Sequence, residues 1–261
     1  MMVVTSLMVI VFIFGFAKVM TITGGSPSGI QDQELVSSES LNQESATKAN
    51  GGDRDDNQVI LTIGDSIGAG VGDERNMGIA QRYVTMQAYE IRDYYEVINY
   101  AVPGAETSDL MGQVTSGEMD EAIVASDLVI VSIGGNNLNR IRNAEATMQL
   151  VEFEEKLGLH LRDLDLVLKY IRDKNSDAEI VVLGLYNPYG RDSDNEDIRL
   201  LQEWNYQTRL LVMTMENVDI VPLYDVFKNN LPLLLSIDAF HPSGEGYERI
   251  AAMIDELMPA K

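Results

Sequence analysis

Two short segments, far apart in the chain, carry side chains that together suit nucleophilic chemistry. Ser66 lies in TIGDSIGAGVGD (62–73), and Asp238 precedes His241 by three residues in DAFHPSG (238–244). A carboxylate that accepts a hydrogen bond from one imidazole nitrogen fixes the tautomer, so that the other nitrogen can take a proton from a serine hydroxyl. The pattern therefore predicts Ser66 as nucleophile, His241 as general base and Asp238 as the residue that orients it.

A nucleophilic serine also needs hydrogen-bond donors for the oxygen anion of a tetrahedral intermediate. The candidates are the backbone N–H of Ser66, the backbone N–H of Gly104 and the side-chain amide of Asn136 in GGNN (134–137). Gly104 equally fits a plain turn after Pro103, and Asn136 fits a loop cap. Neither residue type decides the matter by itself.

Ser66 has three competing interpretations. A phosphate-binding loop needs Lys followed by Ser or Thr after its glycines, whereas here Gly72 leads to Asp73. A helix cap fits Asp65 and Ser66 well, because both residue types are good caps. Residues 64–68 also satisfy G-x-S-x-G, but that nucleophile elbow follows several earlier strands of its domain, and Ser66 follows the first.

Five apolar, β-branched runs must position these residues. They are QVILTIG (58–64), YEVINYAV (95–102), DLVIVSIGG (127–135), EIVVLGLY (179–186) and VDIVPLYD (218–225). Continuous apolar runs are typical of strands buried on both faces, and the longer segments between them repeat leucines at helical spacing, most clearly over 151–173. We therefore predict one α/β domain with a five-stranded parallel sheet, helices on both faces, and a closing helix over 246–258.

The carboxyl ends of parallel strands meet at one edge of the sheet, and ligands bind there. The serine, the Gly104 segment, GGNN and the DAFHPSG loop all follow predicted strands, which favours a shared site over a simple helix cap. Tyr186, Asn187, Tyr189 and Phe240 are expected to border its substrate pocket. The other histidine, His160, lies at the rim of the apolar stripe of 151–173 and is expected to be a partly buried structural residue.

Composition excludes several classes of partner and chemistry. The chain has 41 acidic and 19 basic residues and a net charge of −22, which repels nucleic acids. It has no cysteine, which excludes disulfides, thiolate metal ligands and a cysteine nucleophile. We expect no nucleic-acid partner, no metal or other cofactor, and a monomer.

The first part of the chain differs in character from the rest. Residues 1–17 are uncharged and mostly apolar, and Lys18 is followed by more apolar residues up to Thr23. This length suits a hydrophobic helix that anchors the chain in a membrane or is cleaved as a signal. Residues 24–57 are polar and poor in aromatic residues, which predicts a disordered linker before the domain at 58–261. We expect the domain to lie outside the cytoplasm.

The four blocks around Ser66, Gly104, Asn136 and His241 with Asp238, in this order, resemble those of the SGNH, or GDSL-type, esterase and lipase family. The resemblance implies a flavodoxin-like three-layer fold, no metal, and hydrolysis of acyl esters of lipids or carbohydrates through an acyl-serine. GLYNP (184–188) and the N-terminal segment are similar to a membrane-anchored or secreted bacterial branch.

The sequence departs from the family pattern at one position. The third block commonly ends in Asp where this chain has Asn137, which leaves the hydrogen bonding of that loop open. Two alternatives to ester hydrolysis also remain. A non-catalytic module that binds a glycan or a protein would use the same sheet edge, and an acyltransferase would use the same three residues.

Overall fold

The computed structural model describes residues 57–87, 94–144, 150–190, 193 and 195–258. The predicted N-terminal segment (1–23) and the predicted linker (24–57), except Asn57, lie outside the described residues. In the described ranges, no helix combines the length and the apolar composition that a membrane crossing requires.

The five predicted strands form one parallel sheet. Its strands are β1 (Gln58–Gly64), β2 (Tyr95–Asn99), β3 (Leu128–Ser132), β4 (Glu179–Leu183) and β5 (Val218–Val221), in the spatial order β2-β1-β3-β4-β5. Every residue of the central strand β3 is buried, whereas no residue of the edge strand β2 is buried and β5 is buried only at its two ends. The predicted burial on both faces thus holds for the inner strands β1, β3 and β4 but not for the edge strands.

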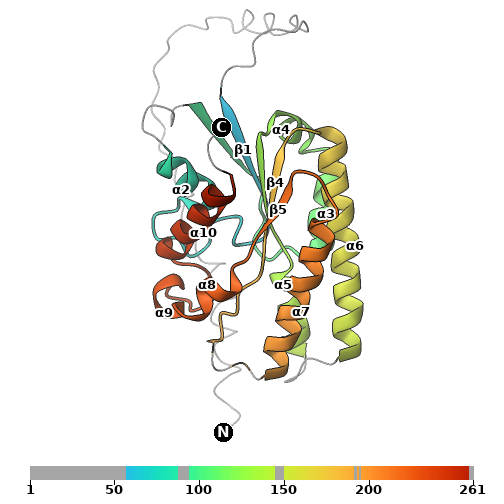
Figure 1. The fold of residues 1–261 in the computed structure, drawn as a ribbon, viewed down its shortest axis with the longest axis vertical. Helices are drawn as coiled ribbons and strands as arrows, with labels where there is room; N and C mark the ends of the chain where they lie inside the picture. The colour runs from blue at the N-terminus through green and yellow to red at the C-terminus, as the bar shows by residue number, and fades with distance from the viewer. Residues whose placement is uncertain (1–56, 88–93, 145–149, 191–192, 194, 259–261) are drawn as a thin grey trace, which may run out of the picture. The chain divides into compact units, whose positions relative to one another are not determined.

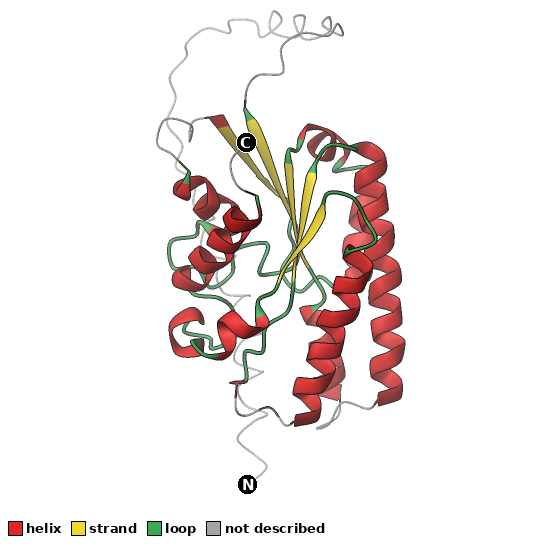
Figure 2. Ribbon diagram, in the orientation of Figure 1, coloured by secondary structure: helices red, strands yellow, loops and turns green. Residues whose placement is uncertain are grey.

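Helices cover both faces of the sheet and complete a three-layer α/β fold (Figures 1 and 2). On one face lie α2 (Gly78–Met86), α8 (Tyr224–Lys228), α9 (Leu231–Leu234) and α10 (Gly244–Leu257). On the other lie α3 (Thr107–Thr115), α4 (Asp120–Ala125), α6 (Leu150–Lys174) and α7 (Asn195–Val212), and α5 (Gly135–Ala144) packs against α6 and α7.

Side-chain alternation in the strands divides the core between these two faces. In β1, Leu61 and Ile63 pack with the helices on the α6 side, whereas Ile60 packs with those on the α10 side. Both clusters consist mainly of buried aliphatic side chains, joined on the α10 side by aromatic ones, so each helix layer is held mainly by apolar burial. The sheet is therefore a rigid support for the loops at its carboxyl edge.

The strand order reverses at β1, which is the topological switch point of the sheet. The strand β2 lies on one side of β1, and β3 lies on the other. Such a switch point opens a crevice at the carboxyl ends of the two strands where the connections diverge. The backbone N–H of Asp65, just after β1, donates to the carbonyl of Ser132 at the end of β3 (2.8 Å), which closes the floor of this crevice.

Two local expectations need correction. His160 on α6 is not a partly buried residue at the rim, because only 1% of its surface is exposed. Its ring stacks on Trp204 of α7 at 4.5 Å between centroids, and hydroxyl groups from two other segments meet its two nitrogens. GGNN (134–137) is not only a loop, since Gly135 begins α5 and Asn136 lies in its first turn.

The end of β1 yields a stability prediction. Gly64 has φ of +119°, and a Cβ at this position would overlap the carbonyl of Ser132. Gly64→Ala should therefore lower the free energy of unfolding by about 4 kcal/mol or more. Gly112→Ala is the matched control, because no atom lies within 4 Å of its added Cβ on α3, and it should stabilise by about 1 kcal/mol. Urea unfolding measures both, and similar values for the two variants would contradict the prediction.

Candidate active site

The fold brings Ser66, His241 and Asp238 into hydrogen-bonding contact. The hydroxyl of Ser66 lies 2.9 Å from Nε2 of His241, across 175 residues of sequence. On the other side of the ring, Nδ1 of His241 lies 2.7 Å from Oδ2 of Asp238. Ser66 is nearly buried, and the side chain of His241 is 19% exposed, so the hydroxyl and Nε2 face a sheltered space that a small molecule can reach.

A tight turn holds Asp238 in place. Its Oδ1 accepts hydrogen bonds from the hydroxyl of Ser236 (2.7 Å) and from the backbone N–H groups of Phe240 and His241 (2.9 Å each). Partial burial alone would raise the pKa of Asp238, but the bond from His241 and these three donors lower it well below its usual range. Asp238 is therefore an anion whose second oxygen is aimed at the imidazole.

The glycines after Ser66 allow the two loops of the site to meet. Gly72 has φ of +95°, and a Cβ there would lie 2.6 Å from the carbonyl oxygen of Pro242 and 2.8 Å from Cβ of His241. The phenol of Tyr247 in α10 also donates to the carbonyl of Val71 (2.7 Å). The glycine pattern therefore serves close packing of the Ser66 loop against the His241 loop.

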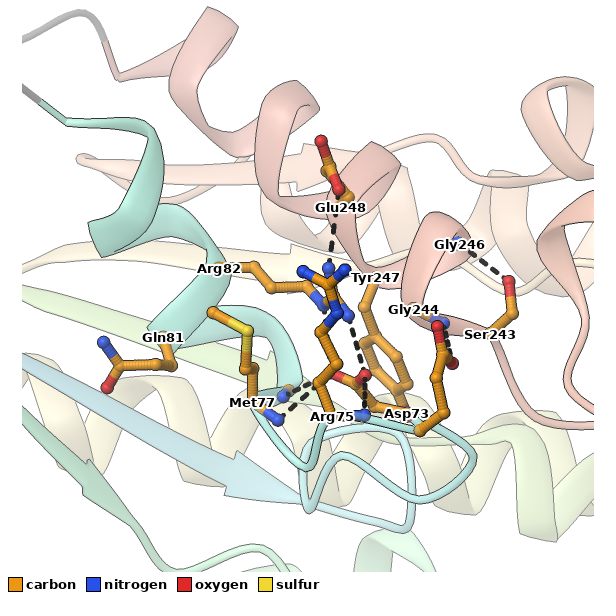
Figure 3. A network of polar contacts seen from close by, with 12 residues as sticks. Asp73, Arg75, Met77, Gln81, Arg82, Ser243, Gly244, Gly246, Tyr247 and Glu248 are labelled. Carbon is orange, nitrogen blue, oxygen red and sulfur yellow. Dashed lines mark hydrogen bonds and ion pairs between the residues drawn. The ribbon is translucent and has the colours of Figure 1, made fainter.

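A charged network secures the same junction (Figure 3). The carboxylate of Asp73 accepts two hydrogen bonds from Arg82 on α2, at 2.7 and 2.9 Å. It accepts three more from backbone N–H groups, one in the preceding turn at Arg75 and two at the start of α2. Burial alone would raise the pKa of Asp73, but the bonds from Arg82 and the backbone lower it to about 2. Both side chains are nearly buried, which favours a fixed geometry over a surface ion pair.

Glu74 and Glu248 extend this network to α10. The backbone N–H of Gly244, the first residue of α10, donates to Glu74 (2.8 Å), and Arg82 also contacts Glu248 (3.4 Å). Figure 3 shows Arg82 between Asp73, in the loop after β1, and Glu248 on α10. Sequence reasoning missed this group, because the only signal was an acidic pair, Asp73 and Glu74, at the end of a glycine loop.

Two of the predicted oxyanion donors, Ser66 and Asn136, line one cavity, whereas Gly104 lines a separate hollow together with Pro103 and Ala105. Within the described ranges, the backbone N–H groups of Ser66 and Gly104 donate to no protein acceptor. The side-chain amide of Asn136 donates one hydrogen to the carbonyl of Ala105 (2.9 Å), which ties it to the Gly104 segment and leaves its second N–H for another acceptor. The N–H groups of Ser66 and Asn136 are thus available to a developing oxygen anion, and the bond to Ala105 links Asn136 to the segment of Gly104.

Asn137 has a defined place in this region. Its Oδ1 accepts from the backbone N–H (3.0 Å) and lies 2.9 Å from the hydroxyl of Thr107, the first residue of α3. A carbonyl oxygen is sufficient for both bonds, so Asn replaces the Asp of the family pattern without loss of these contacts. Sequence patterns did not point to Thr107, because the contact joins residues 30 positions apart.

Asp65 is a second carboxylate beneath the site, and it is only 3% exposed. Burial raises its pKa to about 6, although hydrogen bonds from the hydroxyl of Ser132 (2.8 Å) and the N–H of Ile67 (3.0 Å) oppose the shift. The positive charge of a protonated His241 also opposes it. Asp65 thus orients the turn that carries Ser66, but its ionised form destabilises the folded protein because the buried charge is poorly solvated.

A cavity of about 70 Å³ opens beside Ser66. All four residues predicted to border the substrate line it, namely Tyr186, Asn187, Tyr189 and Phe240. The amide of Asn187 is engaged within its own loop with Gly190 and Ser193, and the phenol of Tyr186 donates to the carbonyl of Phe240 (2.7 Å). Further apolar lining comes from Leu138, Leu185 and Leu201.

The chain is similar in sequence to a known family and to two bacterial proteins. Residues 62–249 match the GDSL-like lipase/acylhydrolase family. The chain is 30% identical over 206 residues to the uncharacterized protein YpmR of Bacillus subtilis (strain 168), covering 75% of this chain and 79% of YpmR. It is 25% identical over 213 residues to the spore germination lipase LipC of Bacillus licheniformis, covering 76% and 93% respectively.

Solved structures share the fold. The crystal structure of the lipase Lip_vut3 from a goat rumen metagenome superposes with a TM-score of 0.69 at 23% identity, covering 76% of this chain and 96% of that one. An acetylxylan esterase from Geobacillus stearothermophilus gives a TM-score of 0.58 at 19% identity, covering 78% and 95%. The fold and the comparisons define a carboxylic-ester hydrolase. The chain belongs to the GDSL-like lipase/acylhydrolase family.

The buried carboxyl of Asp65 predicts a pH-dependent stability difference. Its pKa is about 6 in the folded protein and near 3.8 when unfolded, so the folded state binds the proton more tightly and loses stability as pH rises from 4 to 6. Asp65→Asn keeps Oδ1 but removes the titration. Relative to wild type, the variant should gain about 2 kcal/mol between pH 4 and pH 7. Urea unfolding of both proteins at both pH values measures this. If the difference in unfolding free energy between variant and wild type is the same at both pH values, the pKa of Asp65 is not raised by folding.

Proposed function

We propose that this chain hydrolyses acyl esters through a covalent intermediate on Ser66, with His241 as general base and Asp238 as the residue that orients it. The observation that carries the proposal is the unbroken pair of contacts Ser66–His241 (2.9 Å) and His241–Asp238 (2.7 Å). A binding module needs no such aligned hydroxyl, imidazole and carboxylate. The proposal also fits the ester-hydrolase class of the family.

The first half of the reaction transfers the acyl group to the enzyme. Oγ of Ser66 attacks the ester carbonyl while its proton passes to Nε2 of His241, and Asp238 stabilises the imidazolium that forms. The carbonyl oxygen becomes an anion that accepts hydrogen bonds from the N–H groups of Ser66 and Gly104 and the amide of Asn136. The bond to the leaving alcohol then breaks, and the alcohol takes the proton from His241.

The second half returns the enzyme to its starting state. A water molecule attacks the acyl carbon and gives its proton to Nε2 of His241, and the same donors hold the new oxygen anion. The bond between the acyl carbon and Oγ of Ser66 breaks as His241 protonates that oxygen. The carboxylic acid is then released.

The cavity beside Ser66 supports a short acyl group as its occupant. Its walls are mostly apolar, with Leu138, Leu185, Tyr186 and Leu201 among them, so a hydrocarbon chain gains from leaving water there. Its volume of about 70 Å³ sets a limit on length. We infer that the acyl part enters this cavity, whereas the alcohol part remains toward solvent.

Replacing the nucleophile tests the reaction directly. Ser66→Ala should lower kcat for p-nitrophenyl butyrate by about 10⁴-fold or more, because no other hydroxyl contacts His241 among the described residues. The variant should also lose labelling by a fluorophosphonate probe. Ser116→Ala, at the exposed end of α3, is the matched control and should keep both properties. Labelling of Ser66→Ala at the wild-type level would refute the assignment.

A panel of p-nitrophenyl esters tests the acyl site, because the leaving group is the same in every member. The value of kcat/KM should be highest for acetate or butyrate and should fall for decanoate and dodecanoate, whose chains exceed the cavity. Equal or rising values up to dodecanoate would contradict a short acyl site. That result would leave the role of Ser66 intact.

A further inference from the structure

Behind the oxyanion donors lies a chain of buried polar groups that the proposed reaction does not use. His160 of α6, Thr107 at the start of α3 and Asn137 in the first turn of α5 are all at most 6% exposed. Nδ1 of His160 lies 2.8 Å from the hydroxyl of Thr107, and that hydroxyl lies 2.9 Å from Oδ1 of Asn137. These two successive contacts therefore connect the helices α6, α3 and α5.

Counting hydrogens limits how these groups can be bonded. Oδ1 of Asn137 is an acceptor, since the backbone N–H of Thr107 donates to it (3.0 Å), and the hydroxyl of Thr107 is placed to donate to it as well. On the other side of the His160 ring, Nε2 lies 3.2 Å from the hydroxyl of Thr208, which is placed to donate to the carbonyl of Trp204 (2.9 Å). Burial lowers the pKa of His160 to about 3, so the ring is neutral and carries one hydrogen. In either tautomer, each ring nitrogen lies within hydrogen-bonding distance of a threonine hydroxyl.

Thr107 and Asn137 are close in sequence to the proposed oxyanion donors. Thr107 follows Gly104 by three residues, and Asn137 follows Asn136 directly. A hydrogen bond from Asn136 to the carbonyl of Ala105 runs between the same two segments (2.9 Å), beside the bonds from Thr107 to Asn137. The Gly104 segment and the first turn of α5 are thus joined by bonds in both directions, and His160 holds the hydroxyl at their centre.

We propose that His160, acting through Thr107 and Asn137, is a positioning residue that sets the separation of the Gly104 and Asn136 donors in the oxyanion site. The inference rests on the proposed function, because it assigns those two donors to the reaction. A core histidine that served packing alone would need only the stack on Trp204. Here one ring nitrogen is committed to the segment that carries Gly104.

Two threonines on opposite sides of the ring provide a matched test. Thr107→Val removes the hydroxyl between His160 and Asn137 but keeps the side-chain shape and the backbone N–H. Thr208→Val removes the hydroxyl at Nε2, on α7, away from the oxyanion segments. Both variants leave one nitrogen of the buried ring without a partner, so both should lose stability to a similar degree.

Only Thr107→Val should impair turnover. We expect its kcat for p-nitrophenyl butyrate to fall about tenfold with KM within twofold of wild type, because donors that are displaced act mainly on the transition state. Thr107→Ser keeps the hydroxyl and should restore most of kcat. Thr208→Val should keep kcat, and thermal melting of each variant reports the stability loss. If Thr107→Val does not fold, His160→Phe, which keeps a ring on Trp204, takes its place and should show the same fall in kcat.

Three outcomes would overturn the proposal. They are an unchanged kcat in Thr107→Val, an equal fall in Thr208→Val, and a rise in KM at constant kcat. Ser66→Ala measured in the same series keeps the two proposals apart. If Ser66→Ala is inactive while Thr107→Val retains full kcat, the positioning role fails and the proposed reaction stands. If Ser66→Ala remains active, the proposed reaction itself fails.

Discussion

The contact between the hydroxyl of Ser66 and Nε2 of His241 depends on two loops that the chain brings together from its opposite ends. One loop leaves β1 in the middle of the sheet, and the other precedes α10 at the edge of a helix layer. Their separation is fixed by backbone packing at Gly72, by the phenol of Tyr247 and by the bond from Gly244 to Glu74. The catalytic distance is therefore a property of the whole α2–α10 layer.

Buried charge supports this junction at an electrostatic cost. Asp73 lies in a buried site where Arg82 and backbone N–H groups fully compensate its charge, which is why its pKa falls although burial opposes ionisation. Asp65 lies nearby without a permanent cation, so burial dominates and its pKa rises. The carboxylate of Asp238 is more exposed and is held by four hydrogen bonds. Aspartate thus has three roles here. Asp73 forms a buried ion pair, Asp65 supports the turn of Ser66 at a cost in stability, and Asp238 is the anion that orients His241.

The two sides of the crevice are built by different physical means. The His241 side is held by the buried Asp73–Arg82 pair and by close backbone contacts. On the other side, neutral hydrogen bonds join Asn136 and Asn137 to the segment after Gly104, and the ion pair of Glu106 with Arg140 joins the start of α3 to α5. The amide of Asn137 adds no negative charge to this side, where such a charge close to an oxyanion would oppose its formation.

The sequence by itself determined the five strands, the helices over 151–173 and 246–258, and the residues that carry the proposed reaction. Apolar runs and leucine spacing depend on local periodicity, and Ser66, Asp238 and His241 were recognisable because few residue types perform this chemistry. Only the tertiary structure decided the partners of His160, the purpose of Gly72 and the pairing of Asp73 with Arg82. Those roles arise from contacts between segments distant in the chain, and such contacts leave no periodic signal in a single sequence.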